Sequence, residues 1–350
     1  MRFSFLAPAA LLAAGALALG ETKTYFSADP AQQQLLWDDF KATFGRTYES
    51  RDDEAARFRI FVDNLKLIDE RNAAETGTAQ HGVSPFADLT TAEFRRSFLN
   101  HDPVKAAGNQ KRRRDFAAPA PLLRRDSDLV DWTGVYTTPV KYQGFCGSCW
   151  AFSAVEQIES DYLRTGGNSS IWEPTPDKGL SVQQPTSCVV YPKPGVGGCD
   201  GGWTENVFEY AEAGLETDFD YPYTSSTGGT PKACEADPAL AVVKTTGYTR
   251  VSSSPEDEEA MAEYVQTTGP LSVCVDASEW GTYTGGVLST CGQAVDHCVQ
   301  AVGIDTKGGY WKVRNSWGTA WGERGFIRVQ YGNNTCNITS DSNFAEVSLA

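Results

Sequence analysis

The stretch Gln143-Gly-Phe-Cys-Gly-Ser-Cys149-Trp-Ala-Phe152 contains two of the nine cysteines in this chain of 350 residues. Beyond Cys149, apolar residues recur at helical spacing and two glycines follow, which predicts a helix over residues 149–163. The unpaired amide groups at the start of a helix favour a thiolate over a thiol. Cys149 is therefore predicted to be a nucleophile, which a neighbouring imidazole would activate further.

Two other interpretations of Cys146-x-x-Cys149 are a redox pair and half of a zinc site. A redox motif of this kind belongs to a βαβ fold, and no such pattern precedes it. A zinc site needs a second pair of ligands at suitable spacing, and Cys199 is too isolated to supply one. We therefore expect no metal and no cofactor.

The chain contains three histidines, and only one of them lies in the long C-terminal part. His81 and His101 come early, so His297 is the single base available there for Cys/His catalysis. A lone histidine is structural more often than catalytic, so its role depends on a partner. Cys149 is the partner that we predict.

The composition and charge of the chain change at two points before this stretch, after residue 20 and after residue 125. Residues 1–20 combine a basic residue, an apolar run and small residues near the end, which is typical of a signal peptide rather than a membrane anchor.

Residues 21–125 contain 17 Lys and Arg and 16 Asp and Glu, whereas residues 126–350 contain 12 Lys and Arg and 29 Asp and Glu. The net charge of -15 therefore belongs to the second part, and it argues against a nucleic-acid binder. The polar, basic linker Lys111–Asp126 joins the parts, and we expect it to be cut at or near Arg125.

The two parts also differ in predicted secondary structure. The first is helical: Asp29-Pro30 begins one helix, Gly45 ends it, and an apolar stripe at helical spacing predicts a second helix around Phe61. In the second part, alternating segments follow the helix over residues 270–278, 297–305, 310–317 and 325–332. This order predicts an α+β fold with a helical lobe and a lobe like an antiparallel β-barrel.

Five segments of the second part resemble, in register, the papain family of cysteine proteases. The signature C-G-S-C-W at 146–150 is typical of papain- and cathepsin-type enzymes, with a His and an Asn far downstream. His297 lies 148 residues and Asn315 lies 166 residues beyond Cys149. The segments are VDWTGVYTTPVKYQGFCGSCWAFS (130–153), GGCDGGW (197–203), GLETDFDYPY (214–223), VDHCVQAVGID (295–305) and VRNSWGTAWGERGFIRV (313–329).

The first part resembles the propeptide of the cathepsin L-like branch of that family. The residues that match its interspersed helix motif are Asp53, Arg57, Phe61, Asn64, Ile68 and Asn72. Asp53 stands where Glu is usual. Gly82-x-Ser84-x-Phe86-x-Asp88 resembles the second propeptide motif, with Ser84 in place of Asn. The resemblance implies a helical propeptide in front of a papain-like two-lobe fold.

The resemblance implies a role for four catalytic residues. Cys149 attacks the scissile carbonyl, and His297 forms an ion pair with it and later protonates the leaving amine. Asn315 orients the imidazole, as the third member of such a triad does. The side-chain amide of Gln143 and the backbone N–H of Cys149 stabilise the oxyanion.

The resemblance also implies where substrate binds. Trp317 shields the His–Asn hydrogen bond and, with Trp321, borders the leaving-group side, and plain core packing is the alternative for both. Gly201 and Gly202 would form the edge that pairs with an extended substrate, which is compatible with a turn after Cys199.

A mainly apolar pocket is implied for the second residue before the scissile bond (P2). Its residues would be Trp203, Cys274, Val295, Cys298 and Asp341. The acidic Asp341 at its floor suggests the hypothesis that the pocket accepts Arg as well as Leu or Phe. An Asp341 side chain turned to solvent is the alternative.

In an oxidising compartment, eight of the nine cysteines can form four disulfides, and one must stay free or bridge to another chain. The resemblance implies the disulfides Cys146–Cys199, Cys188–Cys234 and Cys291–Cys336, with Cys149 free. Cys274 and Cys298 either form a fourth disulfide or remain two small buried thiols. We favour the disulfide because the compartment is oxidising.

Together these features predict a signal peptide over residues 1–20, an inhibitory propeptide over 21–125 and a papain-like peptidase domain over 126–350. The expected function is a monomeric cysteine endopeptidase, inhibited by its own propeptide, that acts on proteins and peptides. We expect it in a lysosome, a vacuole or outside the cell, with no membrane contact after signal cleavage. Sequons at Asn168, Asn333 and Asn337 permit glycosylation. The alternative is a catalytically weak or dead homologue that binds peptides, although all four catalytic positions are present.

Overall fold

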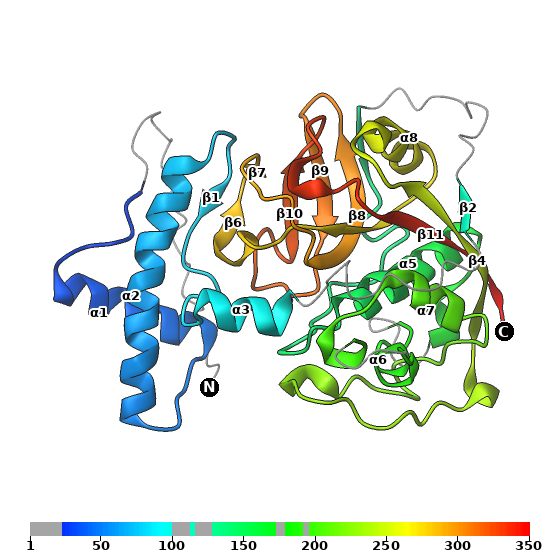
Figure 1. Ribbon diagram of the computed structural model, residues 1–350, viewed down its shortest axis with the longest axis horizontal. Helices are drawn as coiled ribbons and strands as arrows, with labels where there is room; N and C mark the ends of the chain where they lie inside the picture. Colours follow the sequence, from blue (N-terminus) through cyan, green and yellow to red (C-terminus); the bar gives the residue numbers. More distant parts are fainter. Residues whose placement is uncertain (1–22, 100–112, 116–127, 173–178, 192–195) are drawn as a thin grey trace, which may run out of the picture.

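A computed structural model of the chain describes residues 23–99, 113–115, 128–172, 179–191 and 196–350. The predicted signal peptide and the predicted cleavage site at Arg125 lie outside the described residues. Within them, residues 23–99 form a mostly helical pro-region beside a larger unit in which helices pack on a sheet (Figure 1).

The pro-region is built from three helices, α1 (Pro30–Phe44), α2 (Arg51–Ala74) and α3 (Thr91–Phe98). The Asp29 side chain accepts a hydrogen bond from the amide of Ala31, and Gly45 ends α1 in a left-handed conformation with φ 61°, so both predicted ends of the first helix are confirmed. An aromatic and aliphatic core that includes Trp37 and Phe61 joins α1 to α2. Figure 1 shows α1 crossing α2, with α3 leading toward the larger unit.

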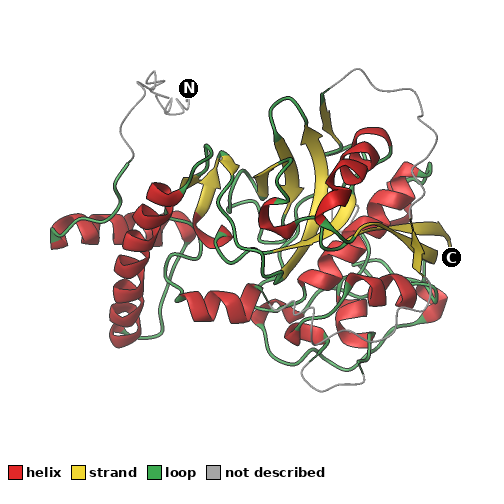
Figure 2. Cartoon of the chain, turned by 45° about the horizontal axis from the view of Figure 1, so that its top comes forward, coloured by secondary structure: helices red, strands yellow, loops and turns green. Residues whose placement is uncertain are grey.

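The larger unit separates its helices from most of its strands (Figure 2). Its helices are α5 (Cys149–Arg164), α6 (Gln183–Cys188), α7 (Thr204–Tyr210) and α8 (Glu258–Thr267). Its strands are β3 (Leu129–Asp131), β4 (Val243–Ser252), β5 (Leu271–Val275), β6 (Tyr283–Gly285), β7 (Val287–Leu288), β8 (His297–Asp305), β9 (Tyr310–Arg314), β10 (Phe326–Gln330) and β11 (Ser342–Leu349). This is the predicted α+β architecture.

One sheet of nine strands organises the larger unit. Its order is β2-β4-β11-β5-β8-β9-β10-β7, where β2 (Arg113–Asp115) is a linker strand parallel to β4, and β3 pairs with β8 off this path. The strand predicted over 297–305 is confirmed as β8, whereas the one predicted over 310–317 ends at Arg314. That strand ends early because Asn315 and Ser316 leave the sheet, and their side chains bond to His297 and Gln143.

Helix α5 is buried on every side from Cys149 to Tyr162, whereas its sequence predicts only one apolar face. It packs between the sheet strands β8 and β11 and helix α7. Its charged side chains tolerate burial because each has a cationic partner: Glu156 with Arg314, Glu159 with Lys141, and Asp161 with Arg164. The pairs of Glu156 and Glu159, whose partners lie outside α5, anchor the helix that begins at Cys149.

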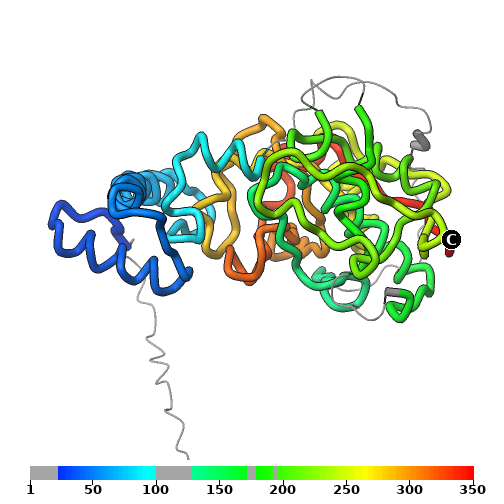
Figure 3. Tube along the Cα trace, turned by 90° about the horizontal axis from the view of Figure 1, so that it is seen from below, coloured from blue at the N-terminus to red at the C-terminus, as the bar shows by residue number. Residues whose placement is uncertain are grey.

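The pro-region docks on the larger unit through backbone and aromatic contacts. Strand β1 (Gln80–His81) pairs antiparallel with β6, and Figure 3 shows this part of the pro-region beside residues near 285. Phe86, Phe94 and Phe98 join the core of the sheet lobe, and all three rings contact Trp317. The end of α3 is thereby held over the residues described next.

Candidate active site

The start of α5 positions the thiol of Cys149. Cys149 is the first residue of the helix and is fully buried in the chain that includes the pro-region. The backbone amides of Cys298, in β8, and Trp150 lie within hydrogen-bonding reach of its sulfur. Because β8 begins at His297, this contact brings the thiol to the end of the strand that carries the histidine.

The imidazole of His297 is oriented by Asn315. His297 Nε2 lies 2.8 Å from Asn315 Oδ1, and the same oxygen accepts the backbone N–H of Ser316 at 2.8 Å. A backbone N–H must meet an acceptor, so this atom is the amide oxygen, and Nε2 must carry the hydrogen that it receives. Nδ1 is then the nitrogen left for proton exchange with a thiol.

Tryptophan rings cover this hydrogen bond. Trp317 stacks on His297 with ring centres 4.9 Å apart, and Trp280 meets the imidazole edge-on at 6.3 Å. Trp321 is completely buried and packs against Trp317 at 4.8 Å. Trp317 therefore packs on the imidazole as the predicted shield would, and shielding of the His–Asn bond stays a prediction, whereas Trp321 is buried in the core.

The side-chain amide of Gln143 is held from both ends. Its Oε1 accepts the hydroxyl of Ser316 at 2.7 Å, and its Nε2 donates to the backbone oxygen of Cys146 at 2.9 Å. The backbone oxygen of Phe98, the last residue of α3, lies 3.4 Å from the same Nε2. A carbonyl of the pro-region thus faces the amide that is predicted to stabilise the oxyanion.

Burial raises the pKa of the Cys149 thiol to about 12, against the neighbouring amides of Cys298 and Trp150 that lower it. The sequence predicts a lowered pKa for this thiol, because a helix N-terminus and an imidazole favour a thiolate. The difference has a physical cause: the covered site excludes the water that would solvate a thiolate. Burial therefore favours the neutral form of the Cys149 thiol in the described chain.

Comparison with known proteins decides the family. Residues 126–345 match the model of the papain family cysteine proteases, and residues 37–94 match the cathepsin propeptide inhibitor domain. The chain belongs to the papain family of cysteine proteases. It is 37% identical to a cathepsin L-like proteinase of Phaedon cochleariae, over 85% of this chain and 89% of that protein. It is 36% identical to cysteine proteinase B of Leishmania mexicana, over 87% of this chain and 67% of that protein.

Solved structures agree with this membership and include the pro-region. Digestive procathepsin L 3 from the larval midgut of Tenebrio molitor superposes with a TM-score of 0.75 at 30% identity, covering 90% of this chain and 99% of that one. The recombinant stem bromelain precursor gives 0.70 at 30% identity, covering 91% and 99%. The α+β papain fold with a preceding propeptide is thus shown for this protease.

The glycines of the expected substrate edge have a structural reason of their own. A Cβ atom at Gly202 would lie 2.6 Å from the Trp150 ring and 2.6 Å from the Tyr191 hydroxyl, so no larger residue fits there. Gly201 adopts φ 94° directly after Cys199 and Asp200. Tight packing on α5 explains Gly202 without a bound substrate, and pairing of this edge with substrate stays a prediction.

Three of the predicted P2 pocket residues lie beside one ionic cluster: Cys274, Cys298 and Asp341. Asp341 is buried, with 4% of its surface exposed, so the alternative of an Asp341 turned to solvent is wrong. Its Oδ1 lies 3.2 Å from Arg250 Nη2 and accepts a hydrogen bond from Asn343 at 2.8 Å. Arg250 also pairs with Glu205 of α7, two residues after Trp203. The carboxylate at the pocket floor is therefore already engaged by a guanidinium.

A disulfide forms the wall beside that cluster. Cys274 of β5 faces Cys298 of β8 across the sheet, and their sulfur atoms are bonded. Val295 precedes His297 on the same segment and is partly buried.

The other disulfides join the pairs implied by the family: Cys146–Cys199, Cys188–Cys234 and Cys291–Cys336. Cys149 is the one free cysteine, and all nine lie within the described residues.

Sequence reasoning missed the side chains that support this site. Ser316, Tyr223, Arg250 and Arg314 bond to predicted site residues or to their neighbours, but no motif spacing identifies them. For Ser316 and Arg314 a signal existed, because they directly flank Asn315. Tyr223 and Arg250 come from a loop and a strand far away in the sequence.

Proposed function

We propose that this protease is a cysteine endopeptidase made as a zymogen, in which Cys149, His297, Asn315 and Gln143 are the catalytic residues. The observation that carries the proposal is the His297–Asn315 hydrogen bond beside the start of α5, under a tryptophan cover. In catalysis, Nδ1 of His297 takes the thiol proton, and the thiolate attacks the scissile carbonyl. The same nitrogen then returns the proton to the leaving amine.

The oxyanion of the tetrahedral intermediate is stabilised by two fixed donors. One is the Gln143 amide, which Ser316 holds in place, and the other is the backbone N–H of Cys149 at the helix start. Donors of this kind need no reorganisation at the moment of reaction, so they stabilise the transition state more than the substrate. A substrate carbonyl would take the place that the Phe98 oxygen occupies in the zymogen.

The pro-region inhibits the same chain by covering this site. Phe98 is completely buried, and its carbonyl faces Gln143, so no substrate carbonyl can bind while α3 is docked. We expect incubation of the full chain at pH 4–5 to shorten it and to start hydrolysis of peptide substrates. If neither the chain length nor the activity changes, the zymogen proposal is wrong.

His81 is the group that we expect to make the docking sensitive to acid. It lies in β1, is 2% exposed, and its Nδ1 is 2.9 Å from the Thr282 hydroxyl of the larger unit. Arg71 Nη1 donates to the same hydroxyl at 2.7 Å, so the hydroxyl proton is directed to a neutral imidazole. Burial and the charge of Arg71 lower the pKa of His81 to about 4, and Glu75 opposes them. Glu279 is the charged group of the larger unit that acts on Arg71.

The sign of the pH effect follows from this lowered pKa. Docking holds His81 neutral, so the contact is unaffected above pH 6.5 and weakens as the pH falls from 6.5 toward 4, by roughly 3 kcal/mol in total. The variant His81→Gln has no such titration, and we expect its processing rate to rise less steeply over this range. His101→Gln, the control, should keep the wild-type profile. An unchanged profile for His81→Gln would rule out this role.

The P2 pocket is expected to prefer Leu or Phe over Arg. A P2 guanidinium would have to share Asp341 with Arg250, so its burial would be poorly compensated. We expect kcat/KM for peptides with P2 Leu to exceed that for P2 Arg by at least about 10-fold. Equal rates on the two peptides would contradict this prediction and restore the hypothesis that the pocket accepts Arg.

The variant Arg250→Met tests whether the ion pair sets this preference. It removes the internal partner of Asp341, so the ratio of P2 Leu to P2 Arg hydrolysis should fall. The matched control is Lys312→Met, which breaks the more exposed Lys312–Asp131 pair and should leave the ratio unchanged.

The remaining assignments follow the domain order. We propose a signal peptide over residues 1–20, a propeptide over 21–125 and a peptidase domain over 126–350, with a lysosome, vacuole or the cell exterior as the location. The proposed partners are protein and peptide substrates, and the enzyme is proposed to be a monomer. No helix among the described residues is long and apolar enough to cross a membrane.

A further inference from the structure

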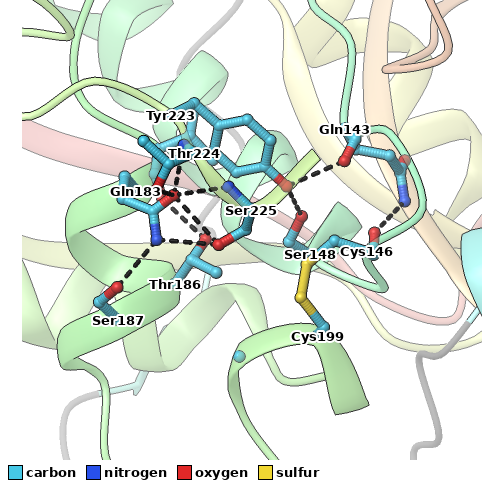
Figure 4. The surroundings of a disulfide bond; sticks show 12 residues. Gln143, Cys146, Ser148, Gln183, Thr186, Ser187, Cys199, Tyr223, Thr224 and Ser225 are labelled. Atoms are coloured by element: carbon cyan, nitrogen blue, oxygen red, sulfur yellow. Dashed lines mark hydrogen bonds between the residues drawn. A yellow bond between two sulfur atoms is a disulfide. The ribbon is translucent and has the colours of Figure 1, made fainter. Parts of the chain in front are cut away.

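One tyrosine hydroxyl connects the two segments that supply the oxyanion donors. Tyr223 Oη lies 2.9 Å from the backbone oxygen of Gln143 and 2.8 Å from the hydroxyl of Ser148, the residue before Cys149 (Figure 4). The Tyr223 ring comes from a loop between α7 and β4. It therefore joins Gln143 to the start of α5 from outside both segments.

The directions of these two hydrogen bonds are determined by their chemistry. A backbone carbonyl can only accept, so Tyr223 donates its single proton to Gln143. The Ser148 hydroxyl must then donate to the Tyr223 oxygen. Burial raises the pKa of Tyr223, although the Ser148 hydrogen bond opposes it, so the phenol stays protonated and keeps its role as a donor.

This arrangement also affects the first turn of α5. A serine at the N-cap usually accepts a hydrogen bond from an amide of that turn. Here the Ser148 side chain makes no such bond to α5 and points to Tyr223 instead. The amides of Cys149 and Trp150 are thus left near the thiol, whereas those of Ala151 and Phe152 bond to the backbone oxygen of Ser148.

Tyr223 is itself held rigidly. Its ring packs edge-on against Phe152 of α5, with ring centres 4.9 Å apart. The next two residues are fixed as well, because Gln183 Oε1 accepts the backbone amides of Thr224 at 2.8 Å and Ser225 at 3.1 Å (Figure 4). A rigid loop therefore carries the hydroxyl that bridges Gln143 and Ser148.

We propose that Tyr223 is a positioning residue for the oxyanion hole, which fixes the main chain of Gln143 against the start of α5 so that both donors point to one oxygen. This inference rests on the proposed function. It adds a residue that acts on the transition state through its hydrogen bond to Gln143.

The variant Tyr223→Phe removes the hydroxyl and keeps the ring. The full chain is activated by acid, and active sites are counted with a thiol-directed epoxide. We expect kcat per active site to fall by about 10- to 100-fold with little change in KM, because misplaced donors weaken transition-state binding only. The rate at which iodoacetamide alkylates Cys149 should stay unchanged, because alkylation forms no oxyanion. Tyr221→Phe, whose hydroxyl bonds to Ala233 and Glu235 away from the site, is the matched control and should keep the wild-type kcat.

A double variant separates positioning from general damage. On a Gln143→Ala background, Tyr223→Phe should cause little further loss, since its effect passes through Gln143. Full additivity, an unchanged kcat in Tyr223→Phe, or an equal loss in the alkylation rate would each overturn the proposal. If Tyr223→Phe does not fold, Ser148→Ala replaces it, because this variant removes the hydrogen bond between Ser148 and Tyr223. It must lower kcat and leave the alkylation rate unchanged. A wild-type kcat in Ser148→Ala overturns the proposal. A wild-type chain that alkylates at Cys149 but hydrolyses no peptide would instead refute the proposed function.

Discussion

The Cys149→Ser chain is expected to remain full length at pH 4–5 and to hydrolyse peptides at least about 10⁴-fold more slowly than the acid-activated wild type. The reason is the difference between a thiol and a hydroxyl. The start of α5 and the imidazole of His297 can stabilise a thiolate, but a serine hydroxyl is far too weak an acid to form an alkoxide there. Mass spectrometry measures the chain length, and a fluorogenic peptide measures the activity.

Two controls make this result specific to catalysis. Serine is almost isosteric with cysteine, so the urea midpoint of the Cys149→Ser zymogen should match that of the wild type. A small amount of activated wild-type enzyme added in trans should shorten the variant, which shows that its linker can be cut. Peptidase activity retained by the pure variant would contradict the assignment of Cys149 as the nucleophile.

Arg314→Met is expected to lower the free energy of unfolding by about 3–5 kcal/mol, the largest stability effect that we predict. Arg314 is fully buried at the end of β9, next to Asn315, and its Nε lies 3.4 Å from Glu156 of α5. Its guanidinium also donates to the backbone oxygen of Thr138 and, at 2.6 Å, to Gln300. Burial already raises the pKa of Glu156 to about 7 despite the opposing charge of Arg314. Without Arg314, the buried Glu156 carboxylate loses the positive charge that stabilises it most.

The double variant Arg314→Met with Glu156→Met shows whether Arg314→Met loses stability because the buried charge of Glu156 is left without its partner or because packing is disturbed. Replacing both members of a buried ion pair by apolar residues is often close to neutral, so the double variant should regain most of the lost stability. Urea unfolding of the inactive Cys149→Ser zymogen at pH 7 measures both. A double variant that is as unstable as Arg314→Met would show that the charge of Glu156 is not the cause.

Part of the candidate site was predictable because Cys149 and His297 begin recognisable elements, the helix α5 and the strand β8. Asn315 was identified by the family resemblance alone, because the strand predicted over 310–317 ends at Arg314. Charged residues inside α5 were not predictable in this way. The apolar face of the helix does not reveal that Glu156 and Glu159 are buried too, because their partners Arg314 and Lys141 lie far away in the sequence.

Long-range polar contacts and the docked pro-region account for the other differences. Asp341 looked like an open acid at a pocket floor, but Arg250 reaches it from β4, about ninety residues earlier. The sequence predicts an ionised Cys149 thiol, but the thiol is fully buried in the folded chain, and burial raises its pKa. A single sequence shows which residues carry charge, whereas the fold decides which of them meet and which lose water.

Whether the pro-region covers a reactive Cys149 is measured by the attachment site of a thiol-directed epoxide before and after acid activation. The full-length chain and the acid-shortened chain are treated at the same pH, and the adduct is mapped by peptide mass spectrometry. If the pro-region covers a reactive cysteine, the adduct forms rapidly on Cys149 of the shortened chain, slowly on the full-length chain, and not at all on Cys149→Ser. Equal labelling of both forms, or an adduct on another residue, would contradict the account.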